Sequence, residues 1–361
     1  MRKRTRVGIT LLMVSGLILG GCGNRGQEQP DQGAENQITE SQALENQPEE
    51  GKQPETGEDK VYKVIFAHHQ TTDSPIGMGI DRLAATLNEK SNGRLEVQVY
   101  PAEQLGNESS VYEQLCQGSV QMSTFGFGII GSQSPTALAM EMGYMFEDSD
   151  HLQKFLVSDV FSGMVEDTIS SSGVHILGAY YNGTRHLTTT HARVEGPEDM
   201  KGLKIRVPNS EMILATLGAM GCNPTVMAFS ETYMGLQNGT VEGQENPVPS
   251  IVSMNFQEVQ KYLCKTAHMI QAASICINEE FLKSLPEDLQ KLMVEETQAE
   301  LQAVSQDVLQ KEVDQEKILT DAGMEIVETD KEAFQACMTD VIAEYEKVWG
   351  EGLYDRIQAT K

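Results

Sequence analysis

Basic side chains are scarce in this sequence. Its 361 residues include 27 Lys and Arg against 53 Asp and Glu, which gives a formal charge of -26. Such a surface repels phosphate backbones and anionic lipid headgroups, so we exclude nucleic-acid binding and electrostatic docking to membranes. Hydrophobic residues still make up 39 % of the chain, which is enough for a sizeable core and excludes wholesale disorder.

Cysteines are also few, and no two of them form a C-x-x-C pair. Apart from Cys22 they are odd in number and widely spaced, so a disulfide framework does not organise the fold. We expect most of them to be small buried side chains, and the sequence leaves a single disulfide open. These five are Cys116, Cys222, Cys264, Cys276 and Cys337.

The common catalytic signatures G-x-S-x-G, H-E-x-x-H and the P-loop are absent from the sequence. A G-x-G-x-x-G run does occur at 126–131, but Pro135 falls where the helix of a dinucleotide site would have its interior. We interpret this run as a glycine-rich strand exit. His68 and His69 lack further ligands at metal-binding spacing, so we expect one histidine in a cleft and the other packed or solvated. We therefore predict no cofactor, no metal and no catalytic residues.

The single long apolar run lies at the N-terminus. Residues 2–6 are mainly basic and residues 7–21 are apolar or small, a run too short and too early for an ordinary membrane span. Cys22 follows Leu-Gly-Gly, which resembles the bacterial lipobox. The resemblance implies that residues 1–21 are a lipoprotein signal peptide and that Cys22 carries the lipid.

We predict that residues 22–60 are a lipidated cysteine followed by a disordered acidic tether. The stretch is rich in Gln, Glu, Asn and Pro and has almost no apolar side chain, so it cannot bury enough surface to offset the entropy of ordering. A coil of this length reaches roughly 35 Å. We expect the folded part to lie outside the cell, anchored to the outer face of the cytoplasmic membrane.

Strand and helix patterns alternate from residue 61 onward, which predicts an α/β fold with a largely parallel sheet. The first alternating series has predicted strands at 63–67, 95–99 and 120–124, with a helix beginning near Pro75 and another ending at Gly118. The second alternating series has predicted strands at 176–180, 203–207, 223–226, 241–244 and 272–277. Its predicted helices are at 212–220 and from a Ser230 cap to residue 237.

A helical stretch of more than thirty residues follows Pro286 and contains no glycine or proline before Gly323. It is longer than a typical globular helix and could bind two domains together. A short strand at 324–327 and a last helix at 331–349 complete the predicted elements.

Arg206 lies in a predicted strand that otherwise consists of Leu, Ile and Val. An arginine that faces inward from such a strand needs an anion, either an internal carboxylate or a ligand.

Several segments resemble the solute-binding proteins of tripartite ATP-independent periplasmic (TRAP) transporters, and the resemblance covers essentially all of residues 61–361. It is carried by YNGTR (181–185), MKGLKIRVPN (200–209), EGQENP (242–247), YPAEQLGNE (100–108) and SLPEDLQK (284–291).

The resemblance implies a two-lobed clamshell with hinge strands and a long helix that spans both lobes. Lobe I would comprise residues 61–182 and 272–312, and lobe II residues 183–271 and 313–361. The implied partners are a small organic acid and the membrane subunits of a TRAP permease, and we expect a monomer.

The resemblance also implies the ligand-binding residues. Arg206 matches the arginine that holds the substrate carboxylate in a two-pronged salt bridge, a geometry that suits a planar guanidinium. The further implied contacts are Arg185, Asn246, Phe229 against the carbon skeleton, Glu108 as an acceptor for hydroxyl groups, and a polar contact from His69.

The solute stays open between a sugar acid or uronate, a C4-dicarboxylate and a 2-oxo acid. The sialic-acid branch has an acid and a base in the loop after the third strand, where this sequence has Gly126 and Ile129. The alternatives to a transport receptor are a ligand-binding module that feeds a sensor kinase and an exported enzyme acting on a carboxylate. We find no nucleophile, base or metal constellation for an enzyme.

Overall fold

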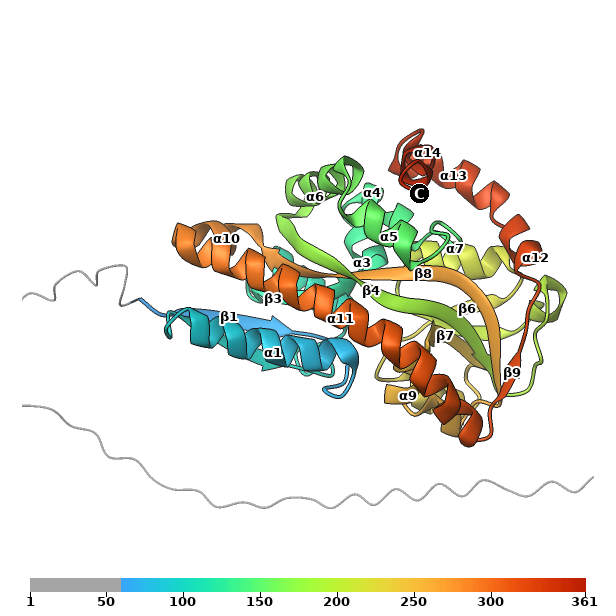
Figure 1. Ribbon diagram of the computed structural model, residues 1–361. Helices are drawn as coiled ribbons and strands as arrows, with labels where there is room; N and C mark the ends of the chain where they lie inside the picture. The colour runs from blue at the N-terminus through green and yellow to red at the C-terminus, as the bar shows by residue number, and fades with distance from the viewer. Residues whose placement is uncertain (1–59) are drawn as a thin grey trace, which may run out of the picture. The chain divides into compact units, whose positions relative to one another are not determined.

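The computed structural model of the protein describes residues 60–361 (Figure 1). The expected signal peptide, Cys22 and nearly all of the expected tether lie outside the described residues. The described part is an α/β unit around one nine-stranded mixed sheet. The strand order is β2 (Leu95–Tyr100), β1 (Tyr62–Ala67), β3 (Met122–Gly126), β8 (Tyr262–Asn278), β4 (Val174–Thr189), β7 (Gly243–Pro247), β5 (Lys204–Val207) and β6 (Asn223–Val226), with β9 (Glu325–Val327) paired to β8. The predicted α/β class is therefore confirmed.

The first alternating series of strands and helices forms as predicted. Helix α1 begins at Pro75 because the Ser74 hydroxyl accepts the Gly77 N–H and proline fits the first helical turn. Its apolar face, including Ile80 and Leu83, packs into the main core. The elements are β1 (Tyr62–Ala67), α1 (Pro75–Lys90), β2 (Leu95–Tyr100), α2 (Glu108–Cys116) and β3 (Met122–Gly126).

A group of short helices follows β3. The strand ends at Gly126 and a five-residue helix begins at once, so the interpretation of the glycine run as a strand exit is confirmed. These elements are α3 (Phe127–Gly131), α4 (Pro135–Leu138), the 3-10 turn η1 (Ala139–Glu141), α5 (Ser149–Leu156) and α6 (Asp159–Ser172).

Strands β4 (Val174–Thr189) and β8 (Tyr262–Asn278) run antiparallel through the middle of the sheet. Each is far longer than the predicted segments 176–180 and 272–277, which were wrong in extent. The pairing of β4 with β8 has three register irregularities, near Leu177, Asn182 and His186. Both strands continue past these irregularities, so polar residues lie inside the strands. The sheet is parallel toward its two edges and antiparallel at β3–β8, β4–β8 and β4–β7.

The second alternating series of strands and helices is largely as predicted, but Ser230 does not cap the helix that follows it. Helix α8 begins two residues later, and the Ser230 hydroxyl donates to the Glu103 carboxylate instead. The elements are the 3-10 turn η2 (Pro197–Met200), β5 (Lys204–Val207), α7 (Glu211–Ala219), β6 (Asn223–Val226), α8 (Thr232–Gln237), β7 (Gly243–Pro247), α9 (Val248–Ser253) and the 3-10 turn η3 (Phe256–Glu258).

Helix α11 (Glu287–Asp321) is the predicted long helix, and it crosses the sheet diagonally past α1, β4 and α9 (Figure 1). Arg82 of α1 pairs with Glu300 of α11, with Nη2 2.6 Å from the carboxylate. The Glu312 carboxylate accepts hydrogen bonds from the Thr184 N–H and the Tyr181 hydroxyl of β4. The helix therefore contacts α1 as well as the central strand β4.

The single last helix predicted at 331–349 is wrong, because three helices end the chain. After α10 (Glu279–Ser284), α11 and β9 (Glu325–Val327) come α12 (Lys331–Ala336), α13 (Thr339–Trp349) and α14 (Leu353–Gln358). Phe334 of α12 and Met338 in the α12–α13 break are both buried, which places the bend against the core, and neither glycine nor proline marks it. Gly350 and Gly352, both with positive φ, separate α13 from α14.

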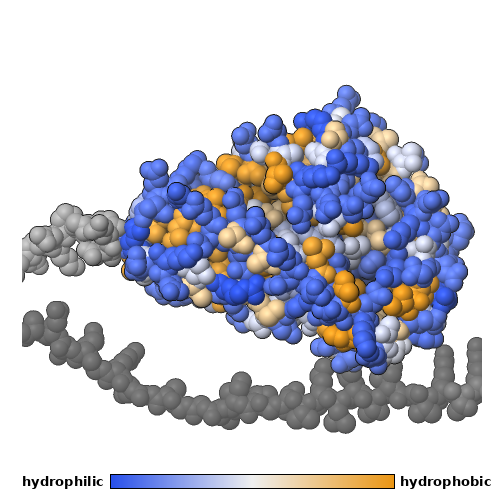
Figure 2. All heavy atoms as spheres, in the orientation of Figure 1, coloured by the Kyte–Doolittle hydropathy of each residue, from blue (hydrophilic) through white to orange (hydrophobic). Residues whose placement is uncertain are grey.

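The five cysteines within residues 60–361 are unpaired, and Cys222, Cys264 and Cys276 are buried as expected. Polar side chains dominate the face drawn in Figure 2, with separate apolar patches between them. Over the described range, no helix has the length and apolar character that crossing a bilayer requires.

Candidate functional site

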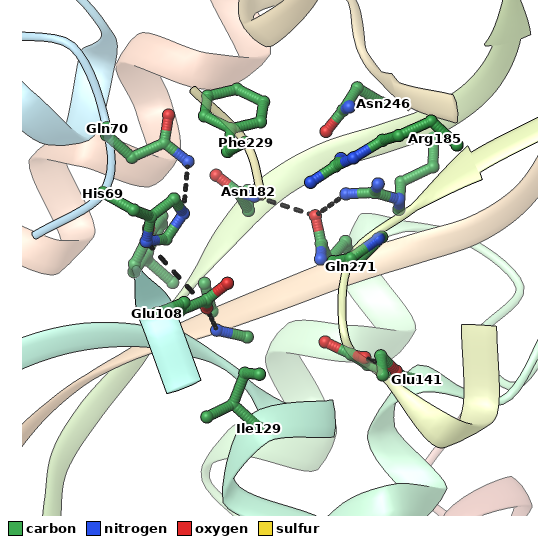
Figure 3. A pocket seen from close by; sticks show the side chains of 16 residues that line it. His69, Gln70, Glu108, Ile129, Glu141, Asn182, Arg185, Phe229, Asn246 and Gln271 are labelled. Atoms are coloured by element: carbon green, nitrogen blue, oxygen red, sulfur yellow. Dashed lines mark hydrogen bonds and ion pairs between the residues drawn. The ribbon is translucent and has the colours of Figure 1, made fainter. Parts of the chain in front are cut away.

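A pocket lies where the carboxyl ends of β1 and β5 meet the two long central strands. Its lining includes all the residues that the sequence predicted as ligand contacts (Figure 3). These are His69, Glu108, Arg185, Arg206, Phe229 and Asn246. The structure therefore brings them together, and their roles toward a ligand stay a proposal.

Arg206 is 2 % exposed and comes from β5, as the apolar pattern of that strand predicted. Its Nε and Nη2 donate to the Met227 carbonyl at 3.0 and 2.8 Å. No carboxylate among residues 60–361 forms an ion pair with it. Burial lowers the pKa of this guanidinium to about 10, so it stays charged near neutral pH and lacks a counterion in contact.

Phe229 and His69 close the pocket beside Arg206. The guanidinium carbon lies 5.6 Å from the centre of the Phe229 ring, and His69 meets the same ring edge-on at 5.9 Å. Burial lowers the pKa of His69 to about 4, so its imidazole is neutral near pH 7. His68 is buried and does not line the pocket, which agrees with the expectation of one histidine in a cleft and the other packed.

Glu108 is the first residue of α2, and one carboxylate oxygen accepts the Gly126 N–H at 2.9 Å. The same oxygen lies 3.9 Å from Nδ1 of His69. Burial raises the pKa of Glu108 to about 6, although Gly126, Arg206 and Arg185 oppose that rise. The carboxylate is held at the pocket wall and has lone pairs left for hydroxyl donors.

Arg185 differs from Arg206 because it already has an internal anion. Its Nη2 lies 2.6 Å from Oε1 of Glu245, its Nε donates to the other oxygen, and its Nη1 donates to Gln271 at 2.8 Å. His268 lies 3.1 Å from the same carboxylate. Arg185 and His268 hold the pKa of Glu245 at about 2, against the effect of burial. This buried ion pair fixes β4 against β7.

Amide side chains complete the upper wall of the pocket in Figure 3. Asn246 donates to Gln244 at 2.6 Å, and Asn182 donates to the Gln271 oxygen at 2.8 Å. The sequence analysis missed Asn182 and Gln271 as pocket residues. Asn182 lies inside the quoted YNGTR motif, so its place was open to prediction, whereas Gln271 comes from the unforeseen extension of β8.

Glu141 is a further lining residue that the sequence analysis missed. It ends η1, is 2 % exposed, and accepts the Ser210 hydroxyl at 2.6 Å. Burial raises the pKa of Glu141. No motif surrounds it in the sequence, and only the fold of the short helices after β3 brings it to the pocket.

Comparison with known proteins agrees with this geometry. Residues 66–350 match the family model DctP, described as bacterial extracellular solute-binding protein, family 7. The sialic acid-binding periplasmic protein SiaP of Vibrio cholerae is 33 % identical over 77 % of this chain and 86 % of its own length. The 2,3-diketo-L-gulonate-binding periplasmic protein YiaO of Escherichia coli is 32 % identical over 69 % of this chain and 76 % of its own.

Solved structures share the fold. A TRAP periplasmic solute-binding protein from Roseobacter denitrificans with bound β-D-glucuronate is 27 % identical with a TM-score of 0.79, covering 83 % of this chain and all of the other. One from Sulfurospirillum deleyianum with bound succinate is 28 % identical with a TM-score of 0.78, covering 84 % of this chain and all of the other. The expected two-lobed clamshell is confirmed.

These relatives are solute-binding proteins, which favours that function over the sensor-kinase module and the exported enzyme considered from the sequence. The expected resemblance to TRAP solute-binding proteins is confirmed. The chain belongs to the DctP family of bacterial extracellular solute-binding proteins.

Proposed function

We propose that this protein captures a small organic acid by its carboxylate on Arg206 and delivers it to the membrane subunits of a TRAP permease. The observation that carries the proposal is a buried, charged guanidinium that lines a pocket without a carboxylate in contact. Leaving such a charge unpaired is costly, and a ligand carboxylate would supply the missing partner. The guanidinium fork suits the two oxygens of a carboxylate.

The remaining lining suits a hydroxylated carbon skeleton. Phe229 offers an apolar face, while Glu108, Asn182, Asn246 and Gln271 offer hydrogen-bonding groups around it. Relatives described as binding sialic acid, 2,3-diketo-L-gulonate and glucuronate support a sugar acid as the solute.

Arg185 has a narrower role in this proposal than the sequence suggested. Its Nε and Nη2 groups bind Glu245, so it stiffens the wall and does not offer a free fork. Any direct contact with the ligand would use the edge of a guanidinium that is already anchored.

We further propose that lobe I comprises residues 61–182 and 272–312 and lobe II residues 183–271 and 313–361. The register irregularity between Tyr181 and Gly183 in β4 supports a hinge at this boundary, since Gly183 has φ 118. Asn209 donates to Ser109 at 3.0 Å and Ser230 donates to Glu103, and both hydrogen bonds join the proposed lobes. Ligand contacts from both lobes would favour the closed form.

The lipid anchor is part of the same proposal and rests on the sequence Leu-Gly-Gly before Cys22. Wild-type protein should fractionate with membranes and incorporate labelled palmitate, and Cys22→Ser should block the labelling and the normal maturation. An unlabelled wild type found free in the medium would refute the anchor and leave the solute-binding proposal standing.

The solute-binding proposal is tested by a thermal-shift screen of the folded unit against uronates, aldonates, C4-dicarboxylates and 2-oxo acids, followed by calorimetry on the hits. At least one acid should raise the melting temperature and bind with a 1:1 stoichiometry. If no carboxylic acid in the screen binds, while neutral sugars or amines do, the proposal is wrong.

A further inference from the structure

Glu141 places a second carboxylate in the pocket wall, below Gln271 in Figure 3. The side chain is buried, and Ser210 of the β5–α7 connection donates to Oε2 at 2.6 Å. Carboxylates almost never occupy buried positions without a structural or functional reason. No lysine or arginine among the described residues forms an ion pair with Glu141.

The glycine run after β3 is built around this carboxylate. A Cβ on Gly128 would lie 2.3 Å from Oε2 of Glu141 and 2.2 Å from the Ser210 hydroxyl, and a Cβ on Gly126 would lie 2.6 Å from Oε1. All three distances are far below any real Cβ contact, so a side chain at either position would have to displace Glu141 or Ser210. The absence of a side chain at the two glycines therefore leaves room for the Glu141 carboxylate.

The charges that line the pocket are unevenly matched. Arg185 is neutralised by Glu245, and the low pKa of His69 keeps that imidazole uncharged near pH 7. Arg206 is then the one arginine of the lining without a carboxylate in contact, and the carboxyl groups of Glu108 and Glu141 line the same pocket. Burial raises the pKa of both carboxyl groups, so this end of the pocket already opposes further negative charge.

We propose that Glu141 is a specificity-determining residue that selects polyhydroxylated monocarboxylates and rejects dicarboxylates. The inference rests on the proposed function, because it assumes that one ligand carboxylate pairs with Arg206. A second carboxylate on the same ligand has no cation to meet and would approach Glu108 or Glu141, and like charges brought together in a buried site are strongly unfavourable.

Hydroxyl groups fit the same wall. A carboxylate offers about four acceptor positions. Ser210 donates one hydrogen bond to Glu141, so acceptor positions remain for a ligand hydroxyl. A hydroxyl bonded to a buried carboxylate is a strong contact, whereas an analogue lacking the hydroxyl leaves that carboxylate unsatisfied.

The test compares matched acids that differ only at the far end of the chain: gluconate with glucarate, galactonate with galactarate, and threonate with tartrate. Calorimetry gives the affinity of each acid for the wild type, Glu141→Gln and the control Glu166→Gln. Gln keeps the volume and the acceptor for Ser210 but removes the charge. Glu166 is exposed on α6 and lines no part of the pocket.

The wild type should bind the tightest-binding aldonate at least about tenfold more tightly than its matched aldarate, given the cost of juxtaposed like charges. Glu141→Gln should reduce that ratio at least about tenfold, while Glu166→Gln leaves it unchanged. A wild type that binds an aldarate as tightly as its aldonate, or a ratio that Glu141→Gln changes less than threefold, overturns this inference alone. If neither aldonates nor aldarates bind the wild type while another carboxylic acid of the screen does, this inference falls and the proposed function stands. If no carboxylic acid binds, both fall.

Discussion

Arg206 is the residue on which carboxylate capture depends most directly. Arg206→Ala should weaken binding of the best acid by about 30-fold to several thousand-fold, because removing one partner of a buried charge pair costs about 2–5 kcal/mol. Arg206→Lys should also weaken binding, since an ammonium keeps the charge but loses the fork. Calorimetry gives both values, with the exposed Arg356→Ala as control. A folded Arg206→Ala protein that binds within threefold of wild type would show a purely structural arginine.

Glu108 should make the stability of the ligand-free protein depend on pH. Its pKa of about 6 in the folded protein lies above the ordinary value of 4.5, so the folded state holds its proton more tightly than the unfolded state. The resulting stability is fully present below pH 4.5 and is lost as the pH rises through 6. Glu108→Gln should therefore gain about 1–2 kcal/mol over wild type at pH 7.5 relative to pH 4.5. Urea denaturation at both pH values measures this difference, and an equal effect at both would contradict it.

At the scale of secondary-structure elements, the Glu245 carboxylate joins β7 to β4 through Arg185 and to β8 through His268. Glu245→Gln leaves the Arg185 charge buried and should lower the free energy of unfolding by about 3–5 kcal/mol. Because the pKa of Glu245 is held at about 2, its contribution is present above pH 4.5 and is lost as the pH falls toward 2.

Denaturation of Glu245→Gln at pH 7, beside the exposed Glu231→Gln as control, measures this contribution. A loss no larger than that of the control would mean that the ion pair contributes nothing net to stability.

The sequence predicted most elements because their signals are local. Ser74 and Pro75 mark the start of α1, Gly118 follows the end of α2, and the absence of glycine and proline marks α11. The extents of β4 and β8 could not be read in this way, because their register irregularities place polar residues inside continuous strands. The α12–α13 break lacks a local signal and depends on how the chain packs against the core.

The pocket residues also divide into those with a local sequence signal and those without one. Arg206 could be predicted from one charged residue in an apolar strand, and the quoted motifs supplied Arg185, Asn246 and Glu108. Glu141 could not, because its approach depends on three short helices that fold back on β3. The pairing of Arg185 with Glu245 was also invisible, although the two residues belong to two of the recognised segments.

At the scale of the whole molecule, the two long strands and α11 connect the proposed lobes. Saturating acid should reduce the radius of gyration measured by small-angle scattering, because ligand contacts from both lobes favour closure. Arg206→Ala should show no such change at the same acid concentration. An identical wild-type profile with and without ligand would argue against closure on binding.

The most direct test of carboxylate capture is a crystal structure of the protein with the tightest-binding acid from the screen. The account predicts that both carboxylate oxygens lie within hydrogen-bond distance of the Arg206 guanidinium, with hydroxyl groups of the ligand directed toward Glu108 and Glu141. A carboxylate bound elsewhere, while Arg206 continues to donate only to the Met227 carbonyl, would contradict the account.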